Sequence, residues 1–319
     1  EAVDRPSGGR KIHQKTTPLL GGLGIGLVIF LFCLYGLSQG WFASADIHPQ
    51  QILGFLLALG LLLVVGALDD IYRLPPILRF SFYAVAALLV IFSGTSIHEI
   101  TRYQGNGSIS LDGWTGTFTL FDWKIALSFP GSFLTFFWLV SVTIAMKIMD
   151  GLDGLVTGQT IIGAGLIGAL TLSTAFFQPS VTVLALFIFM AFIGFLPWNI
   201  NPARQFLGES GSVIAGFSLG FLSIVSGAKL ATALMALGLP LADVGIVALG
   251  RIRRGVSPWQ GDKTHLHFRL LERGLSQRQA VAVLWLIALV FGVAALTLQT
   301  RGKVLLLIGL VGLTLLLSI

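Results

Sequence analysis

The chain has 319 residues, of which 55% are hydrophobic and only 11% are charged, whereas an ordinary soluble domain has about 25% charged residues. This composition excludes a soluble globular fold. The formal net charge of +6 points to anionic lipid headgroups rather than nucleic acid, because Lys and Arg lie in short segments between apolar blocks. The single cysteine, Cys33, excludes an intramolecular disulfide and a zinc-cysteine cluster.

The apolar residues form blocks of roughly 20 residues, the length that a helix needs to cross about 30 Å of hydrocarbon. They predict an all-α polytopic membrane protein, folded as a single transmembrane domain over residues 1–319, with about ten membrane-spanning helices. The predicted helices are 19–39, 51–68, 77–94, 131–149, 155–176, 180–198, 210–226, 229–249, 280–298 and 303–319.

Residues 95–130 form the one long polar segment on the far side of the predicted membrane. The turn sequences GNG at 105–107 and DG at 112–113 flank a short alternating run at 108–111. This pattern predicts a small extracytoplasmic β-hairpin.

Alternate crossing of the membrane from residue 1 places the segments 1–18, 69–77, 148–155, 199–210 and 250–279 on the starting side. Lys and Arg favour this side by about three to one, so the positive-inside rule predicts that it is cytoplasmic. The threading used no acidic residue, yet it brings seven acids to the same side: Asp69, Asp70, Asp150, Asp153, Glu209, Asp243 and Asp262.

Asp69 and Asp70 end a helix that has no polar residue from Leu61 to Leu68. Adjacent carboxylates are costly there unless a cation compensates them, and a hard divalent ion is the natural partner. A solvated helix end before the turn at 74–76 is the alternative.

Asp150 and Asp153 follow the next helix that runs toward the cytoplasm. Three residues apart, they share one face if the turn stays helical, and the adjoining glycines allow the backbone to approach a ligand. The alternative is an ordinary helix-ending loop, because Asp and Gly are common in such loops.

Residues 199–212 follow a third inward-running helix and combine Asn199, Phe206 and Glu209 with small residues just before a new helix. Glu209 is a candidate metal ligand, and free amides at this helix N-terminus favour phosphate oxygens. Alternatively, Ser210 and Ser212 are only helix caps.

The largest cytoplasmic loop contains His265, His267 and Arg269. In an extended segment all three lie on one side, and in a helix His265 and Arg269 pair at a spacing of four. Either form suits a pyrophosphate, for which Arg offers a bidentate fork. The alternatives are a zinc site and a basic loop that faces lipid. Upstream of the first helix, the basic segment around Lys15 is equally typical of a positive-inside flank.

Together these five strings resemble the polyprenyl-phosphate N-acetylhexosamine-1-phosphate transferase family. Each match is weak alone, but five in order on one predicted face are specific. In chain order they are Lys-x-Thr-Pro-x-x-Gly-Gly at 15–22, Asp-Asp at 69–70, Asp-Gly-Leu-Asp-Gly at 150–154, Asn…Pro-Ala…Phe-x-Gly-Asp-x-Gly-Ser at 199–212 with one change, and His-x-His-x-Arg at 265–269.

The resemblance implies ten or eleven helices around a cytoplasmic cleft in the bacterial inner membrane. It also implies transfer of a sugar 1-phosphate from a UDP-sugar to undecaprenyl or another polyprenyl phosphate, with release of UMP. The two-His loop is similar to the branch that uses UDP-N-acetylglucosamine or a related amino sugar. The expected partners are these substrates and the membrane, with a homodimer as a further expectation and no nucleic acid. The expected cofactor is Mg²⁺, with Mn²⁺ as an alternative.

Three features depart from the family pattern. Glu209 stands where the family has a metal-binding Asp, so the carboxylate reaches one methylene further, which bears on the preferred metal. Lys147 replaces an Asn three residues before Asp150, and we expect it to pair with Asp150 or Asp153 or to hold phosphate. The family's first helix is missing, and the chain begins without Met or a charged-then-apolar leader. We therefore expect a natural N-terminus further upstream and no signal peptide.

Phosphoryl transfer requires alignment and charge neutralisation. We predict that Glu209 and Asp70 bind Mg²⁺ and that Asp69 deprotonates or orients the lipid phosphate. Asp150 and Asp153 are predicted to bind nucleotide or sugar. The other expected substrate contacts are a uracil stack on Phe206 and polar contacts from Lys15, Arg73, Lys147, Asn199, His265, His267 and Arg269.

Direct attack and a two-step route through a phospho-aspartate on Asp69 both fit these residues. An ion-coupled transporter is the main rival function, although its charges would lie near the bilayer midplane in broken helices. A catalytically inactive family member, suggested by the Glu209 and Lys147 changes, is the second rival.

Overall fold

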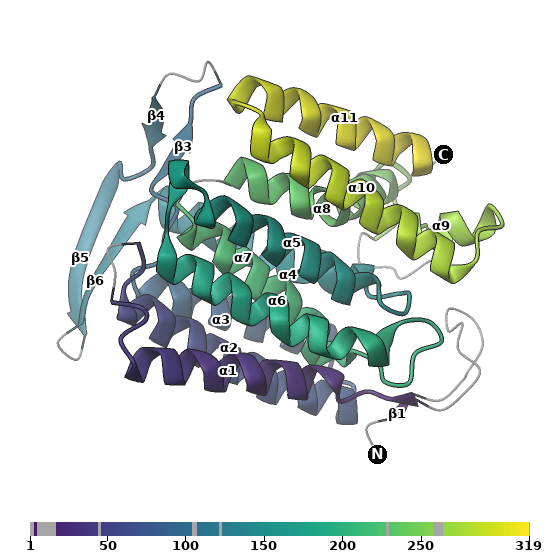
Figure 1. Ribbon diagram of the computed structural model, residues 1–319, viewed down its shortest axis with the longest axis horizontal. Helices are drawn as coiled ribbons and strands as arrows, with labels where there is room; N and C mark the ends of the chain where they lie inside the picture. Colours follow the sequence, from purple (N-terminus) through teal and green to yellow (C-terminus); the bar gives the residue numbers. More distant parts are fainter. Residues whose placement is uncertain are drawn as a thin grey trace.

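The computed structural model describes residues 3–4, 17–43, 46–103, 107–120, 123–227, 230–257 and 264–318. Ten long helices lie side by side as a bundle in this part of the chain, and successive long helices run in opposite directions (Figure 1). The helices are α1 Gly21–Ser38, α2 Pro49–Tyr72, α3 Pro76–Phe92, α4 Gly131–Met149, α5 Leu155–Leu172, α6 Pro179–Asn199, α7 Gly208–Val225, α8 Leu230–Arg253, the short α9 Leu266–Glu272, α10 Gln277–Thr297 and α11 Thr300–Ser318.

The long helices confirm the prediction of an all-α polytopic membrane protein. Each of the ten predicted spans has a counterpart within a few residues, and a single turn of 3-10 helix, Thr174–Phe176, follows α5. By length and composition, 8 of the described helices can cross a membrane. The other two are α3, which has 17 residues, and α8, which carries the buried Asp243.

The end of α2 differs from the prediction in a way that matters for the site. The helix continues to Tyr72 instead of stopping near residue 68, so Asp69 and Asp70 belong to its last turn. Arg73 then ends the helix in the left-handed conformation at φ 53°, and its N–H donates to the carbonyl of Asp69 at 2.8 Å. Consecutive side chains on a helix point about 100° apart, so the two carboxylates face different neighbours.

The polar segment after α3 forms two hairpins rather than one. Strand β3 (Glu99–Thr101) pairs antiparallel with β4 (Ser108–Ser110), and Gly107 of the predicted turn directly precedes β4, whereas residues 105–106 lie outside the described residues. Strand β5 (Trp114–Leu120) pairs antiparallel with β6 (Trp123–Phe129). The second hairpin was missed, although its aromatic and Thr residues favour strands. Both hairpins lie at one end of the bundle, the hairpin end, and α9 lies at the other, the α9 end (Figure 1). A further short pair, β1 (Val3–Asp4) with β2 (Thr17–Pro18), precedes α1.

Helix α7 lies at the centre of the bundle, with 94% of its residues buried. Small residues allow its neighbours to approach closely. A Cβ on Gly66 of α2 would collide with Ser210, and one on Gly22 of α1 would collide with Gly211. Further along, Gly216 packs against Thr143 of α4, where a Cβ would lie 2.7 Å from the Thr143 Cα. These contacts fix the N-terminus of α7 beside α1 and α2, at the α9 end.

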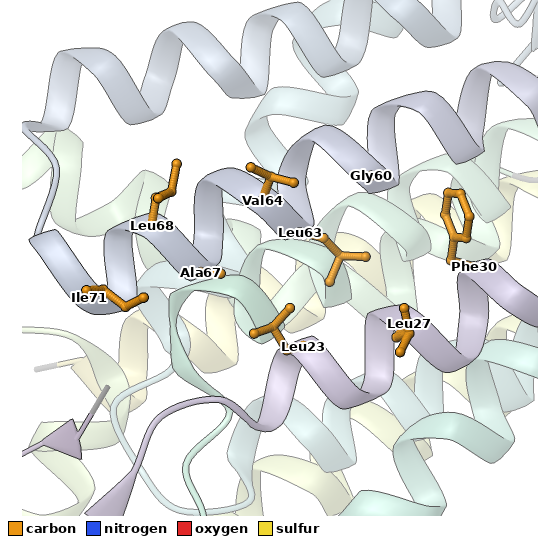
Figure 2. Close-up of a pocket in the computed structure, with 9 residues that line it drawn as sticks. All are labelled: Leu23, Leu27, Phe30, Gly60, Leu63, Val64, Ala67, Leu68 and Ile71. Atoms are coloured by element: carbon orange, nitrogen blue, oxygen red, sulfur yellow. The ribbon is translucent and has the colours of Figure 1, made fainter. Parts of the chain in front are cut away.

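An apolar groove of about 470 Å³ runs between α1 and α2. Its lining residues come from both helices, and the side chains of Leu23, Phe30 and Leu63 lie between them (Figure 2). The groove faces away from α7, because Gly66 and Asp70 occupy the α7 side of the same helix. Hydrocarbon is the occupant that suits this lining: Leu23, Leu27, Phe30, Gly60, Leu63, Val64, Ala67, Leu68 and Ile71.

Candidate functional site

Asp69 has both carboxylate oxygens engaged by the chain reversal between α2 and α3. Its Oδ1 accepts from the Leu74 N–H at 2.7 Å, and its Oδ2 lies 3.3 Å from Nη1 of Arg79. Asp69 is 6% exposed. The neighbouring Arg73, by contrast, is exposed. Asp69 therefore orders this turn and places Arg79, and it is turned away from solvent.

Asp70 caps the N-terminus of α7. One oxygen accepts from the Glu209 N–H at 2.7 Å, and the other accepts from the Ser210 hydroxyl at 3.0 Å and lies 3.4 Å from the Ser210 N–H. A carboxylate is favourable there because of the helix dipole and the unpaired amides. Gly208, at φ +75°, has no side chain to obstruct this approach, since a Cβ would lie 2.8 Å from Oδ2 of Asp70. The amides that the sequence assigned to phosphate oxygens thus hold Asp70 instead.

Glu209, the first acidic residue of α7, is surrounded by groups from α3 and α4. Its Oε1 forms an ion pair with Lys147 and accepts from the Tyr83 hydroxyl at 2.5 Å. Its Oε2 lies 3.7 Å from Nη1 of Arg79. Lys147 therefore pairs with Glu209, and among the described residues it has no ion pair with Asp150 or Asp153, the partners expected from the sequence.

Sequence reasoning did not assign Arg79 or Tyr83 to the site. Both belong to α3, and their spacing of four puts them on one helix face. Tyr83 also accepts from Lys147 Nζ at 3.2 Å. The sequence feature that could have identified them is the spacing of four between Arg79 and Tyr83 in a helix that is otherwise mostly apolar.

Asp150 caps the C-terminus of α4 and is exposed. Within the described part of the chain, its side chain accepts no hydrogen bond and has no ion pair. The surrounding protein reduces the hydration of the Asp150 carboxylate although part of the residue is exposed, and this effect raises its pKa, with the negative charges of Glu209, Asp70 and Asp153 adding to it. Asp150 thus has no compensating cation among the described residues, and a bound cation would oppose this shift.

Asp153 and Asn199 tie neighbouring loops together. Oδ2 of Asp153 accepts from Asn201 Nδ2 at 2.9 Å and from the Ala203 N–H at 3.0 Å. The buried Asn199 accepts from the Thr157 hydroxyl at 2.6 Å and donates to the Gln205 carbonyl at 3.0 Å. The Asn199 amide therefore has structural partners on both sides. Asn201 also donates to Gln277, the first residue of α10, at 2.7 Å. This hydrogen bond joins the loop network to α10.

The histidine segment begins α9 rather than extending as a strand. Nδ1 of His265 lies 2.8 Å from Oδ2 of Asp243, whose Oδ1 accepts from the Leu266 N–H at 2.8 Å. The Arg269 side chain donates to the Thr264 carbonyl at 3.0 Å. Asp243, which lies within α8, is a positioning residue for His265; the sequence placed it among the cytoplasmic acids but gave it no role.

His267 is 1% exposed, and its Nε2 has no hydrogen-bond partner within the described residues. This nitrogen points at Gly151, because a Cβ added to Gly151 would collide with it. Burial lowers the pKa of His267 to about 4, an effect that the positive charge of His265 increases and Asp243 opposes. A neutral imidazole therefore lies directly behind the Asp150 loop.

The described part of the motif at 15–22, residues 17–22, has a structural role. The Phe206 N–H donates to the Pro18 carbonyl at 2.9 Å, and Gly22 donates to the Leu207 carbonyl at 2.9 Å. This pairing docks the start of α1 on the loop before α7 and holds Phe206 half-buried at the α9 end. Lys15, the predicted phosphate contact in this motif, lies outside the described residues.

Only some of the carboxylates at this end of the bundle are available as ligands for a hard cation such as Mg²⁺. Among the residues that the structure describes, no three His, Cys, Asp or Glu side chains are grouped as a metal site. Glu209 already has protein cations as partners, whereas Asp70 has only neutral donors and Asp150 has neither. Oxygen ligands from one or two carboxylates, completed by substrate phosphates, are typical of Mg²⁺. Asp70 and Asp150 meet that requirement.

The fold and this cluster define a polytopic membrane protein with a polar site at one end of its helix bundle. The chain belongs to glycosyl transferase family 4, whose model matches residues 52–227.

Curated relatives agree with this assignment. The chain is 30% identical over 305 residues to a Bacillus subtilis (strain 168) protein named "Probable undecaprenyl-phosphate N-acetylglucosaminyl 1-phosphate transferase", with 94% of this chain and 78% of that protein covered. It is 29% identical to the decaprenyl-phosphate N-acetylglucosaminephosphotransferase of Mycolicibacterium smegmatis, with 94% and 77% covered. It is 25% identical to the undecaprenyl-phosphate alpha-N-acetylglucosaminyl 1-phosphate transferase of Escherichia coli K12, with 90% and 73% covered.

Proposed function

We propose that this chain transfers N-acetylglucosamine 1-phosphate, or a closely related N-acetylhexosamine 1-phosphate, from a UDP-sugar to undecaprenyl phosphate. The reaction takes place at the cytoplasmic face of the bacterial inner membrane. The family match and the names of the relatives support the lipid acceptor and the sugar. The observation that carries the proposal is that the end of α2, the Asp150 loop, the start of α7 and α9 meet at one end of the bundle.

The chemistry is a displacement at phosphorus. An oxygen of the lipid phosphate attacks the sugar-bearing β-phosphorus of the UDP-sugar, a new P–O bond forms, and the bond to the bridging oxygen breaks to release UMP. Attacker, donor and leaving group are all anionic, so positioning and charge neutralisation account for most of the catalysis. A divalent cation, Mg²⁺ or Mn²⁺, supplies part of that neutralisation when it is bound, and Asp70 and Asp150 are the residues that would hold it.

The surrounding residues have distinct parts in this proposal. Arg79 and Lys147 bring positive charge close to the acids, and the exposed Arg73 is free to approach a phosphate. Asp69 acts through Arg79 and not as a proton acceptor, because it is buried and its Oδ2 already pairs with the Arg79 guanidinium. For the same reason direct attack is favoured over a phospho-aspartate on Asp69. Asp153, Phe206 and the α9 residues border the space for the nucleotide and the sugar.

The purified chain in detergent, given UDP-N-acetylglucosamine, undecaprenyl phosphate and Mg²⁺, should release UMP only when the lipid phosphate is present. A panel of UDP-sugars in the same assay identifies the preferred sugar. Absence of lipid-dependent UMP release with every UDP-N-acetylhexosamine would refute the proposal and favour an inactive family member or a transporter.

A further inference from the structure

The two positions that depart from the family pattern contact each other. Lys147 stands in place of an Asn and Glu209 in place of an Asp, and their side chains form a direct ion pair. The longer Glu side chain also reaches the Tyr83 hydroxyl at 2.5 Å, from which Lys147 lies 3.2 Å. The two substitutions therefore form one unit that links α3, α4 and α7.

Asp69 and Glu209 are matched in charge by two protein cations, whereas the third nearby acid, Asp70, is held by neutral donors at the start of α7. Asp69 and Glu209 carry two negative charges, and Arg79 and Lys147 carry two positive charges, with Arg79 placed 3.3 Å from Asp69 and 3.7 Å from Glu209. The Glu209 side chain is 13% exposed and that of Lys147 21% exposed, so solvent screens this pairing only weakly. A divalent ion placed at Glu209 would displace or repel the ammonium of Lys147.

We propose that Lys147 is a built-in replacement for a divalent cation at Glu209, so that any divalent ion of the site depends on Asp70 and Asp150 and not on Glu209. The ammonium supplies the charge compensation that a metal ion would otherwise supply at Glu209. Lys147 is then a positioning residue for Glu209. The link to phosphoryl transfer rests on the proposed function, whereas the assignment of the cation does not.

Binding of Mn²⁺ to the detergent-solubilised chain without substrate tests this assignment, with free Mn²⁺ measured by electron paramagnetic resonance. Lys147→Asn leaves Glu209 without its ammonium and should either bind one additional Mn²⁺ or bind Mn²⁺ at least tenfold more tightly than the wild type. The double variant Lys147→Asn/Glu209→Gln removes both charges and should return to wild-type binding. Lys303→Asn, the same substitution in the first turn of α11 at the hairpin end, is the control and should bind as the wild type does.

Two results would overturn the proposal: a gain of less than twofold in Lys147→Asn, or a gain that persists in the double variant. Thermal unfolding of each variant verifies that it is folded, and if Lys147→Asn does not fold, Lys147→Gln is compared with the double variant instead. UMP release is measured separately, and Lys147→Asn should need at least tenfold less Mg²⁺ for half-maximal release. A wild type without UMP release contradicts the proposed function but leaves the Mn²⁺ comparison decisive for Lys147.

Discussion

Two corners of the site differ in how their polar groups are partnered. In the first, the paired corner, Asp69, Asp70, Arg79, Lys147 and Glu209 all have partners on neighbouring helices. In the second, the open corner of Asp150, Gly151 and His267, the Asp150 carboxylate and the His267 Nε2 have none within the described residues. A buried nitrogen without a partner, such as Nε2 of His267, is costly, whereas the Asp150 carboxylate is exposed.

This difference separates residues that build the site from residues available to a ligand. The paired corner fixes the relative positions of α2, α3, α4 and α7, so its groups are preorganised before substrate arrives. The open corner retains unsatisfied hydrogen-bonding capacity, which substrate or a cation can use. Asp70 connects the two corners, because it anchors α7 and also contributes to the repulsion at Asp150.

Asp150→Asn should give the largest effect. It replaces the carboxyl group of the open corner by an amide of similar shape that cannot become negative when a cation binds, and we expect UMP release to fall by about 10²–10³-fold, the size typical of a lost electrostatic contact to the reacting groups. The melting temperature near neutral pH should rise rather than fall, since Asp150 has no hydrogen bond to the described residues and its raised pKa means that folding disfavours its charge. Asp112→Asn, an exposed position at the hairpin end, is the matched control and should keep its activity. Near-normal turnover of Asp150→Asn would show that the Asp150 carboxylate has no part in catalysis.

Gly151→Ala should have a smaller effect of about 10–100-fold on UMP release. The added methyl group collides with Nε2 of His267, so the Asp150 loop and the imidazole must move apart, and displacements near 1 Å can cost about 100-fold. Gly24→Ala in α1 is the control, because its Cβ meets nothing within 4 Å. Equal activities for the two variants would show that the contact between the loop and α9 has no role in turnover.

Much of the fold follows from the sequence, because a membrane-spanning helix must satisfy its backbone internally and is therefore visible as a long apolar block. The placement of Asp70, Glu209 and Asp150 at one end also follows from alternate crossing. The structure brings these three together: Asp70 caps α7 next to Glu209, and the negative charges of both residues raise the pKa of Asp150.

The pairing of individual side chains could not be predicted from the sequence. Whether Lys147 meets Glu209 or Asp150 depends on the rotation of α4 against α7, which close glycine contacts determine. Asn199 was expected to bind substrate, yet its amide joins Thr157 to Gln205. Roles that require a bound substrate, such as the stacking of Phe206 on uracil, stay predictions.

The smallest predicted effect concerns the pH dependence of stability. Burial lowers the pKa of His267 to about 4, against about 6.5 in an unfolded chain. Between these pH values the unfolded chain binds a proton at this histidine that the folded chain does not bind. The contribution of His267 to the free energy of unfolding is therefore complete above pH 6.5. It is lost on acidification toward pH 4, by up to about 1.4 kcal/mol per pH unit. His267→Gln should therefore flatten the decline in melting temperature between pH 6.5 and 5. Asp150, whose raised pKa acts in the opposite sense, is present in both proteins and does not affect the difference.

The measurement is thermal unfolding of wild type and His267→Gln in the same detergent across that pH range. His48→Gln, an exposed position just before α2 at the hairpin end, reports how far the same substitution alters the slope elsewhere. Parallel slopes for wild type and His267→Gln would mean that His267 is protonated as readily in the folded protein as in the unfolded chain. The imidazole would then have a partner in the folded state, and the contrast between the open and the paired corner would rest on Asp150 alone.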